Sequence, residues 1–313
     1  MLQFRHAVVP AGGAQPSIAG VEDYLGLMKP RVMSLVVFTA LVAMLIAPGH
    51  LHPVIAFASL LCIAIGAGAA GALNMWWDAD IDVLMARTRL RPIPAGRIAP
   101  NEALFFGLTL ALIAVLMLAV VANLLAAALL AFTILFYVVI YTMWLKRRTH
   151  ENIDIGGAAG ALPPMVGYAA ATGSVSLDSF TLFAIIFLWT PPHFWALALV
   201  KSADYGRAGI PMMPNVKGEK RTKAEILAYP LLLAPVALLP RFMGFAGGIY
   251  AAAALIAGAA MIVLAVRVNR TRDEAQGKKA SMQLFGCSIL YLFALFVTLV
   301  VEHSFGLIDR FGL

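Results

Sequence analysis

Three polar residues at the end of one apolar segment have types and spacing that suit a metal–phosphate site. Asn74, Asp78 and Asp82 follow one another at intervals of four residues. If a helix continues through them, their side chains share one face with neighbouring Cβ atoms roughly 6 Å apart, whereas Asp80 points away. Two carboxylates this close repel each other unless a cation joins them. Mg²⁺ binds one or two carboxylates together with substrate phosphate oxygens, so the pattern predicts Mg²⁺ at Asp78 and Asp82, with Asn74 orienting a ligand oxygen.

A solvated acidic helix end is the alternative interpretation, but carboxylates at a helix C-terminus oppose the macrodipole. The stretch Arg-Thr-Arg-Leu-Arg-Pro that begins at Arg87 and includes Arg91 follows directly. Alone, such arginines are typical of a topology determinant that contacts lipid headgroups. Beside a carboxylate pair they favour diphosphate binding, because a guanidinium group can donate two parallel hydrogen bonds to a phosphate.

Two further polar features lie in or just after a later apolar segment. Lys201 and Asp204 are one helical turn apart, and both a structural ion pair and a second binding site remain open for them. His193 lies inside the segment, and ionisable residues within membrane spans are functional candidates. Because Pro191 and Pro192 are expected to break the helix there, the alternative is a histidine that hydrogen-bonds to the freed carbonyl groups.

The composition indicates which elements position these residues. Of 313 residues, 62% are hydrophobic and 12% are charged, whereas soluble domains carry about 25% charged residues. Apolar runs of about 20 residues indicate helices, because every backbone polar group must be satisfied within the bilayer, and the alternating pattern of a membrane barrel is not found. We therefore predict an all-α polytopic membrane protein with nine transmembrane helices. Their approximate ranges are 32–49, 53–77, 103–122, 124–145, 156–174, 180–200, 226–245, 246–266 and 284–302.

The basic residues predict the orientation of this bundle. All but Arg241 and Arg310 of the 23 Lys and Arg residues fall on one side of the predicted spans. The positive-inside rule then predicts a cytoplasmic N-terminus. Because residues 1–20 show no signal- or transit-peptide pattern, we expect a bacterial inner-membrane protein whose active site faces the cytoplasm. The predicted parts are a cytoplasmic tail (1–24), a single nine-helix membrane domain (25–305) and a short non-cytoplasmic tail (306–313).

Several stretches resemble the UbiA-type intramembrane prenyltransferases. The Asn-x₃-Asp-x₃-Asp pattern that begins at Asn74 marks this superfamily. The stretch Thr-Pro-Pro-His-Phe-Trp around His193 and the loop Asp-Tyr-Gly-Arg-Ala-Gly-Ile-Pro from Asp204 are similar to the branch of the superfamily that prenylates haem. The likeness covers residues 23 to about 215. It implies a UbiA-type helical bundle.

The resemblance implies transfer of a farnesyl group from farnesyl diphosphate to the 2-vinyl group of haem b, giving haem O and diphosphate, with Mg²⁺ as cofactor. Many relatives carry a second pair of aspartates that binds a second Mg²⁺ ion. This chain has Asp204 but Ala208 in place of the other aspartate, so this site would have few ligands, and Lys201 is expected to supply positive charge there. The implied roles are metal binding and catalysis for Asp78, Asp82 and Asp204, catalysis for Asn74 and Lys201, and substrate binding for Arg87, Arg91, Lys146, Arg148, Asn152, Tyr205 and His193.

The expected partners are the two substrates and the lipid bilayer, with a haem A synthase or oxidase assembly factors downstream and no nucleic acid. Tyr137, Tyr141 or Trp144 would stabilise an allylic carbocation through cation–π contact. A secondary transporter is a competing class, but the halves show no obvious repeat and the polar residues cluster at one membrane face. A prenyltransferase for a quinone precursor such as 4-hydroxybenzoate is a further alternative, which the Pro-Pro-His-Phe-Trp stretch disfavours.

Overall fold

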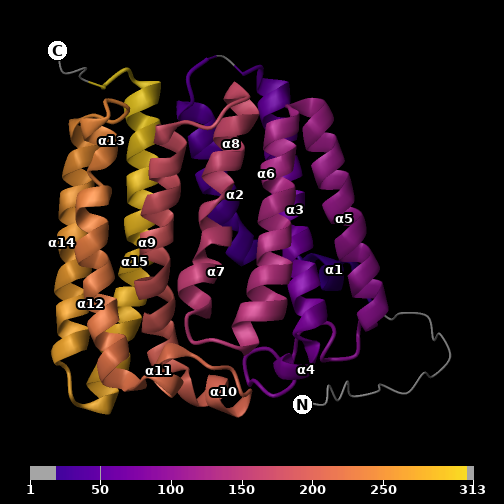
Figure 1. Cartoon of the computed structure of the whole chain (residues 1–313), viewed down its shortest axis with the longest axis vertical. Helices are drawn as coiled ribbons and strands as arrows, with labels where there is room; N and C mark the ends of the chain where they lie inside the picture. Colours follow the sequence, from indigo (N-terminus) through magenta and orange to yellow (C-terminus); the bar gives the residue numbers. More distant parts are fainter. Residues whose placement is uncertain (1–18, 50, 309–313) are drawn as a thin grey trace.

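The computed structural model describes residues 19–49 and 51–308, and within these ranges it is helical with no strands (Figure 1). This confirms the predicted all-α class. Most of the predicted N-terminal tail, residues 1–18, and the end of the C-terminal tail, 309–313, lie outside the described residues; α1 begins at Val21. The helices are α1 Val21–Leu27, α2 Pro30–Ile46, α3 Pro53–Trp77, α4 Ala79–Asp82, α5 Pro100–Val121, α6 Leu124–Leu135, η1 Phe136–Trp144, η2 Leu145–Arg147, α7 Asn152–Ala161, α8 Pro163–Thr172, α9 Leu177–Val200, α10 Ser202–Arg207, α11 Met213–Val216, α12 Gly218–Val236, α13 Leu239–Phe242, α14 Gly248–Arg270 and α15 Glu274–Ser304.

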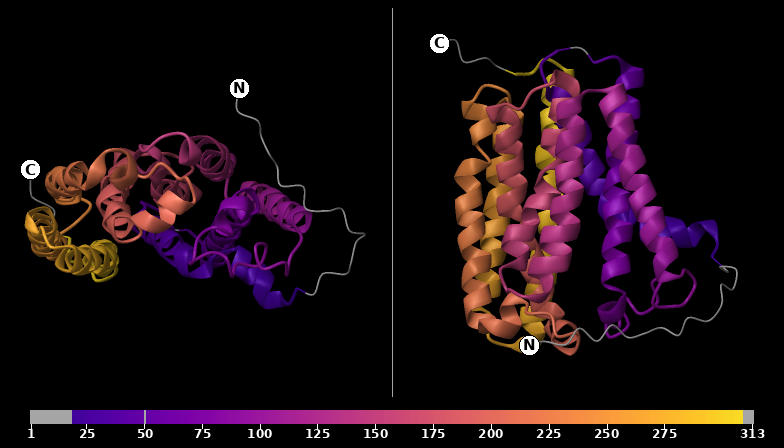
Figure 2. Two further views of the ribbon diagram at one scale, coloured as in Figure 1. Left: turned by 90° about the horizontal axis from the view of Figure 1, so that it is seen from below. Right: turned by 45° about the vertical axis from the view of Figure 1, so that its right-hand side comes forward.

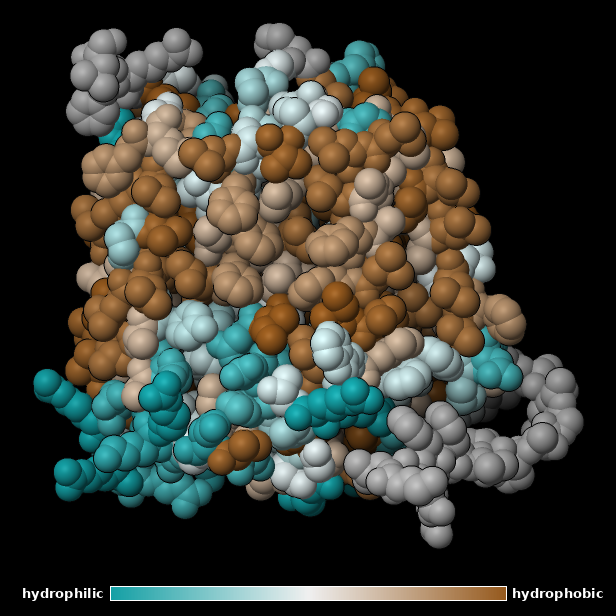
Figure 3. Space-filling view, in the orientation of Figure 1, coloured by the Kyte–Doolittle hydropathy of each residue, from teal (hydrophilic) through white to brown (hydrophobic). Residues whose placement is uncertain are grey.

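On the face shown in Figure 3, apolar side chains cover the middle of the bundle, and hydrophilic side chains gather at the end where α4, α10 and α11 lie (Figures 1 and 3). In the described part of the chain, seven helices are long and apolar enough to cross a membrane, and α1 with α2, which meet at 56°, count as an eighth. The predicted fifth span is two ten-residue helices, α7 and α8, that meet at Leu162 before Pro163. A polytopic helical bundle is confirmed, while the count of nine spans stays a prediction.

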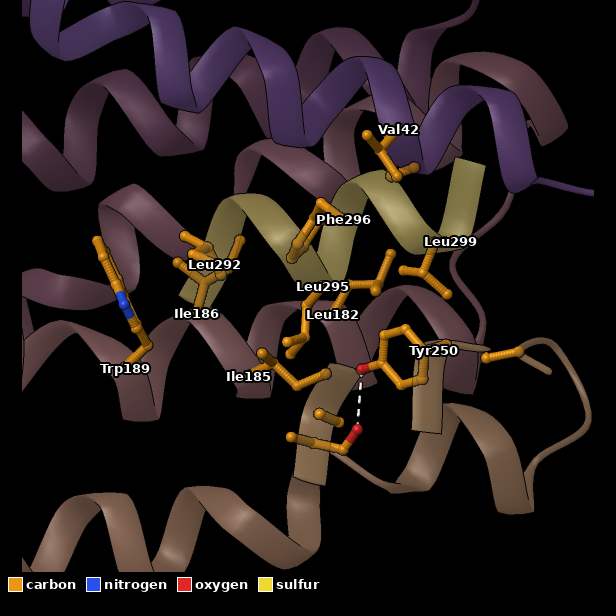
Figure 4. Packing of buried hydrophobic residues seen from close by; sticks show 14 of the residues in the cluster. Val42, Leu182, Ile185, Ile186, Trp189, Tyr250, Leu292, Leu295, Phe296 and Leu299 are labelled. Carbon is orange, nitrogen blue, oxygen red and sulfur yellow. Dashed lines mark hydrogen bonds between the residues drawn. The ribbon is translucent and has the colours of Figure 1, made fainter. Parts of the chain in front are cut away.

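The C-terminal helices α12, α14 and α15 occupy one end of the bundle in cross-section, and α3 and α5 the other (Figures 1 and 2). Side chains of α2, α9, α14 and α15 meet in the main buried cluster, where Val42, Leu182 and Phe296 lie together (Figure 4). The hydroxyl of Tyr250 donates a hydrogen bond of 2.8 Å to the carbonyl of Ala237 in the same cluster. These contacts hold the helices that form one side of the cavity described below.

Glycines allow close helix contacts in the small-residue segment α7–α8. A Cβ added at Gly167 would lie 2.2 Å from the carbonyl oxygen of Ala40 on α2, and one at Gly156 would lie 2.2 Å from the ring of Tyr141. Real Cβ atoms do not approach so closely, so both contacts need glycine. This agrees with the prediction that the segment lies inside the bundle, because small residues let helix backbones approach.

Helix α9 runs without interruption from Leu177 to Val200, through Pro191 and Pro192. The expectation that these prolines break the helix was therefore wrong. Prolines are tolerated in membrane helices where neighbouring helices and local adjustments satisfy the freed carbonyl groups. As a result, His193 projects from a regular helix and has a defined direction.

Candidate active site

A cavity of about 880 Å³ lies between α2, α3, η1, α7, α9 and α15. This volume is near the upper end of the range for small-molecule sites, about 300–1,000 Å³. Most of its wall is apolar, and aromatic rings contribute much of it. The charged and amide side chains on the wall are Lys29, Arg31, Asn74, Asp82, Arg87, Arg91, Lys146 and Asn152.

The end of α3 holds the predicted aspartates in helical register. The amide of Asp78 donates to the carbonyl of Asn74 at 3.0 Å, and the amide of Asp82 donates to that of Asp78 at 2.8 Å, although Asp78 itself has a non-helical ψ of 3°. Asp78 is fully buried and Asp82 is 2% exposed, whereas Asp80 is exposed. The spacing of four residues thus correctly predicts that Asp78 and Asp82 share one face and that Asp80 lies on another.

The side-chain amide of Asn74 connects three elements. Its nitrogen donates to the carboxylate of Asp78 at 2.8 Å and to the hydroxyl of Thr142 on η1 at 2.9 Å. Its oxygen accepts a hydrogen bond from the ammonium group of Lys29. The sequence predicts that Asn74 orients a ligand oxygen, but its amide is engaged by protein groups. In this structure it positions Asp78.

Cations surround the carboxylates. Lys146 forms an ion pair with Asp78, and Arg91 forms one with Asp82 at 2.6 Å. Arg147 donates to both oxygens of Asp80 at 2.7 and 2.8 Å. Partial burial of Asp80 acts to raise its pKa, but these hydrogen bonds outweigh it and the pKa lies below the ordinary value of an aspartate.

The two buried carboxylates fit a divalent ion that shares its ligands with a phosphate. Oδ1 of Asp78 is buried without a hydrogen-bond partner, and 3.8 Å separates it from the guanidinium of Arg147. Among the described residues, no three His, Cys, Asp or Glu side chains are grouped so that they could hold a metal alone. A Mg²⁺ ion at Asp78 and Asp82 would therefore need oxygens from substrate or water, as Mg²⁺ commonly does.

Four of the predicted metal, catalytic and substrate-binding residues are not among the residues that line the cavity: Lys201, Asp204, Arg148 and Asp78. Asp78 is fully buried directly behind the wall, where it contacts the cavity-lining Asn74 and Lys146. Asp204 is paired with Arg207 of its own helix α10 rather than with Lys201, the partner that the sequence left open. Arg148 is exposed. Tyr205, next to Asp204 on α10, does line the cavity, and the roles of Asp204 and Lys201 stay predictions.

The remaining predicted substrate-binding residues do line the cavity: Arg87, Arg91, Lys146, Asn152, Tyr205 and His193. Asn152 is fully buried and donates to the carbonyl of Thr149 at 2.6 Å, while its own side-chain oxygen has no hydrogen-bond partner. Of the three aromatic candidates, Tyr137 and Tyr141 line the cavity, and their ring centroids are 5.4 Å apart. Trp144 is 53% exposed and lies outside it.

The sequence assigned no site role to three cations, Lys29, Arg31 and Arg147. Lys29 and Arg31 line the cavity, and Lys29 also reaches Asn74. Its backbone is left-handed, with φ 52° and ψ 54°, at the bend between α1 and α2; such strain in a non-glycine residue is often found at functional sites. Arg147, next to the predicted Arg148, is the one that pairs with Asp80. The Lys-Pro pair at the start of α2 was the available signal for Lys29.

A membrane helix bundle with paired buried carboxylates, cations and an aromatic-lined apolar cavity defines a class: enzymes that transfer prenyl groups within the membrane. The profile of the UbiA prenyltransferase family matches residues 36–298. The chain belongs to this family.

Relatives and solved structures support the assignment. The chain is 61% identical over 308 residues to a protoheme IX farnesyltransferase of Methylobacterium nodulans, covering 98% of this chain and 97% of that one. It is 62% identical over 296 residues to a protoheme IX farnesyltransferase of Beijerinckia indica subsp. indica, covering 95% and 92%. Its fold is similar to that of a digeranylgeranylglyceryl phosphate synthase (TM-score 0.74, 17% identity, 90% and 99% covered). It is also similar to that of a UbiA homologue from Archaeoglobus fulgidus bound to DMAPP and Mg²⁺ (TM-score 0.63, 14% identity, 89% and 99% covered).

Proposed function

We propose that this chain transfers the farnesyl group of farnesyl diphosphate to the 2-vinyl group of haem b (protoheme IX), giving haem O and diphosphate. The observation that carries the proposal is the cavity, which joins a buried carboxylate–cation cluster to a long apolar, aromatic wall. These two parts suit a charged diphosphate head and a hydrocarbon tail. Relatives about 60% identical over nearly the whole chain are named for the same transfer.

The diphosphate is proposed to lie among Lys29, Arg87, Arg91 and Lys146, all of which line the cavity. Guanidinium and ammonium groups bind phosphate oxygens through charge-assisted hydrogen bonds. Asp78 and Asp82 would hold Mg²⁺, which when bound neutralises developing charge on the leaving group. Lys146 and Arg91, which now pair with these aspartates, would then be released to contact the diphosphate.

Heterolysis of the C1–O bond leaves the electron pair on the diphosphate and an allylic cation on the farnesyl chain. Positive groups aimed at the leaving oxygen favour this step in a water-poor site. Tyr137 and Tyr141 line the cavity, and their aromatic rings suit cation–π stabilisation of the allylic cation. The vinyl carbon of the acceptor then forms a bond to C1, and water adds to the resulting cation with loss of a proton, giving a hydroxyethylfarnesyl group.

The sidedness and surroundings of the enzyme belong to the same proposal. Asp82 belongs to α4, which lies at the hydrophilic end of the bundle (Figures 1 and 3); the positive-inside rule assigns this end to the cytoplasm. We place the enzyme in the inner membrane of a bacterium, with its cavity receiving farnesyl diphosphate from the cytoplasmic side. A haem A synthase or oxidase assembly factors are the proposed recipients of the product.

A panel of acceptors tests the function. Purified protein with Mg²⁺ and farnesyl diphosphate is incubated separately with haem b and with 4-hydroxybenzoate, and the products are identified by mass. We expect a farnesylated, hydrated haem and no prenylated benzoate. Product from 4-hydroxybenzoate alone would replace the proposed acceptor with a quinone precursor, and no product from either by folded protein would refute the transfer.

A further inference from the structure

The imidazole ring of His193, inside a membrane helix, is surrounded by aromatic side chains. Its ring is stacked between Trp189 and Phe285, with centroids 4.4 and 4.5 Å away and interplanar angles of 20° and 23°. Phe194 approaches its edge at 5.2 Å. Both faces of the imidazole are therefore covered, and only its edge is left for other interactions. His193 also lines the cavity.

The hydrogen bonds at Ser288 determine which ring nitrogen carries the proton. The hydroxyl of Ser288 lies 2.7 Å from Nδ1 of His193 and also 2.7 Å from the carbonyl oxygen of Phe285. A hydroxyl has one proton, and the carbonyl can only accept, so the hydroxyl donates to Phe285 and Nδ1–H donates to the hydroxyl. This assignment follows from the hydrogen-bond network and leaves Nε2 with a free lone pair.

Ser288 on α15 also fixes the position of Trp189, one of the two rings stacked on His193. The indole nitrogen of Trp189 donates to the carbonyl of Ser288 at 2.7 Å. Ser288 thus binds Trp189 through its backbone carbonyl and His193 through its side chain. Phe285, one turn earlier on α15, stacks on the other face of the imidazole. Orientation of a neutral imidazole by a hydrogen bond at its second nitrogen is the arrangement typical of metal-ligating histidines.

From this geometry we propose that His193 is the axial ligand, through Nε2, for the iron of the acceptor porphyrin, with Ser288 as its positioning residue. The inference rests on the proposed function, since it names how the acceptor is held in the cavity. The iron belongs to the substrate. Ligation would fix one point of the porphyrin against α9 and leave its vinyl groups to be aligned with the farnesyl chain.

A purely structural role would account for the bond to Ser288, but not for the whole arrangement. A histidine that only joined α9 to α15 would gain nothing from lining the cavity. Aromatic residues that cover both faces keep the ring in one plane and exclude water, and they suit a flat apolar ligand beside the ring. No carboxylate is among the cavity-lining residues near His193 on α9 or α15, so the ring is equipped to act as a neutral ligand.

Spectroscopy of bound haem tests the ligation independently of turnover. Haem b is added to the purified wild type without farnesyl diphosphate, and absorption and resonance Raman spectra are recorded. We expect the signature of histidine-ligated iron, its loss in His193→Gly, and its return when imidazole is added to that variant. His303→Ala, a half-buried histidine at the far end of α15, is the matched control and should keep the wild-type spectrum. An unchanged spectrum in His193→Gly would overturn the proposal.

Metal-free protoporphyrin IX separates ligation from general apolar binding. The wild type should bind haem more tightly than the metal-free ring, and His193→Gly should bind the two equally. Ser288→Ala should weaken haem binding by roughly 10- to 100-fold, the range for lost hydrogen bonds to ligating histidines, with little effect on the metal-free ring. Equal weakening for both rings would show that Ser288 acts only on cavity shape. If the wild type farnesylates haem but shows no histidine ligation, this inference fails while the proposed function stands.

Discussion

The carboxylates and cations of the cavity are balanced in a way that favours an anionic ligand. Asp82 is neutralised by Arg91 and Asp78 by Lys146. Lys29 donates a hydrogen bond to the neutral amide of Asn74. Positive charge therefore exceeds negative charge on this wall. A diphosphate with its metal ion is a net anion and would reduce this excess.

Lys29 provides a test at the scale of one residue. Lys29→Met should lower kcat/KM for farnesyl diphosphate by about 10- to 100-fold, because a hydrogen bond to a charged group contributes about 1.5–3 kcal/mol and 1.4 kcal/mol corresponds to about tenfold. Steady-state kinetics at saturating acceptor measures this. Lys201→Met is the matched control, since Lys201 does not line the cavity, and it should stay near the wild type. The opposite ranking would favour the sequence prediction for Lys201 over the structure.

The contrast between these two lysines shows what residue spacing can and cannot predict. Asp78 and Asp82 were predictable because helical spacing alone places them on one face. The place of Lys29 in the site was not predictable from spacing, because it depends on a left-handed backbone at the bend between α1 and α2. The role of Asp204 stays a prediction, because its position relative to α3 depends on how the loop after α9 folds. In the structure Asp204 pairs with Arg207 of the same turn.

At the scale of elements, the π-helical segment η1 decides how α6 reaches the site. Thr142 donates to the carbonyl of Tyr137, five residues earlier, at 2.8 Å, and its hydroxyl accepts the hydrogen bond from Asn74. The wider turn also leads into Lys146, which pairs with Asp78. Single π-helical turns are often found at functional sites. The sequence does not predict a π-helical turn, since the apolar pattern of the segment is the same for an α-helix.

Thr142→Val tests the role of η1. The variant keeps the shape of the side chain but removes the hydroxyl that holds Asn74, so kcat should fall by roughly 2- to 12-fold, corresponding to a hydrogen bond of about 0.5–1.5 kcal/mol. Thr298→Val removes a hydroxyl that bonds only to carbonyls of its own helix α15 and should retain the wild-type kcat. If the two variants behave alike, the link from η1 to Asn74 has no catalytic role.

At the scale of the whole molecule, hydropathy and charge divide the bundle into an apolar belt and one hydrophilic end. This division was predictable from composition and from the positions of Lys and Arg. The extent of each span was less predictable from the sequence. Helices α7 and α8 are short and meet at Leu162, and α12 includes Pro230 and Pro235. Packing against neighbouring helices determines such segments, and an apolar count along the sequence does not contain that information.

Cysteine labelling tests the predicted sidedness. In a background with Cys62 and Cys287 replaced by alanine, Arg89→Cys and Ser174→Cys place single thiols at exposed positions on opposite ends of the bundle. A membrane-impermeant maleimide should modify Arg89→Cys only in inside-out vesicles and Ser174→Cys only in right-side-out vesicles, because the positive-inside rule puts the arginine-rich end in the cytoplasm. The reverse pattern would invert the topology.

The most direct test of the account compares Asp78→Asn with Asp80→Asn, two neighbouring aspartates that face opposite ways. The measurement is the initial rate of farnesylated haem formation by folded, purified protein at saturating Mg²⁺. Asp78→Asn should lose about 100-fold or more, as when one preorganised group that stabilises developing charge is removed. Asp80→Asn should stay within about fivefold of the wild type, since an exposed ion pair contributes about 0–1 kcal/mol. Near-normal rates in Asp78→Asn, or equal losses in both variants, would contradict a reaction centred on the buried face of this helix end.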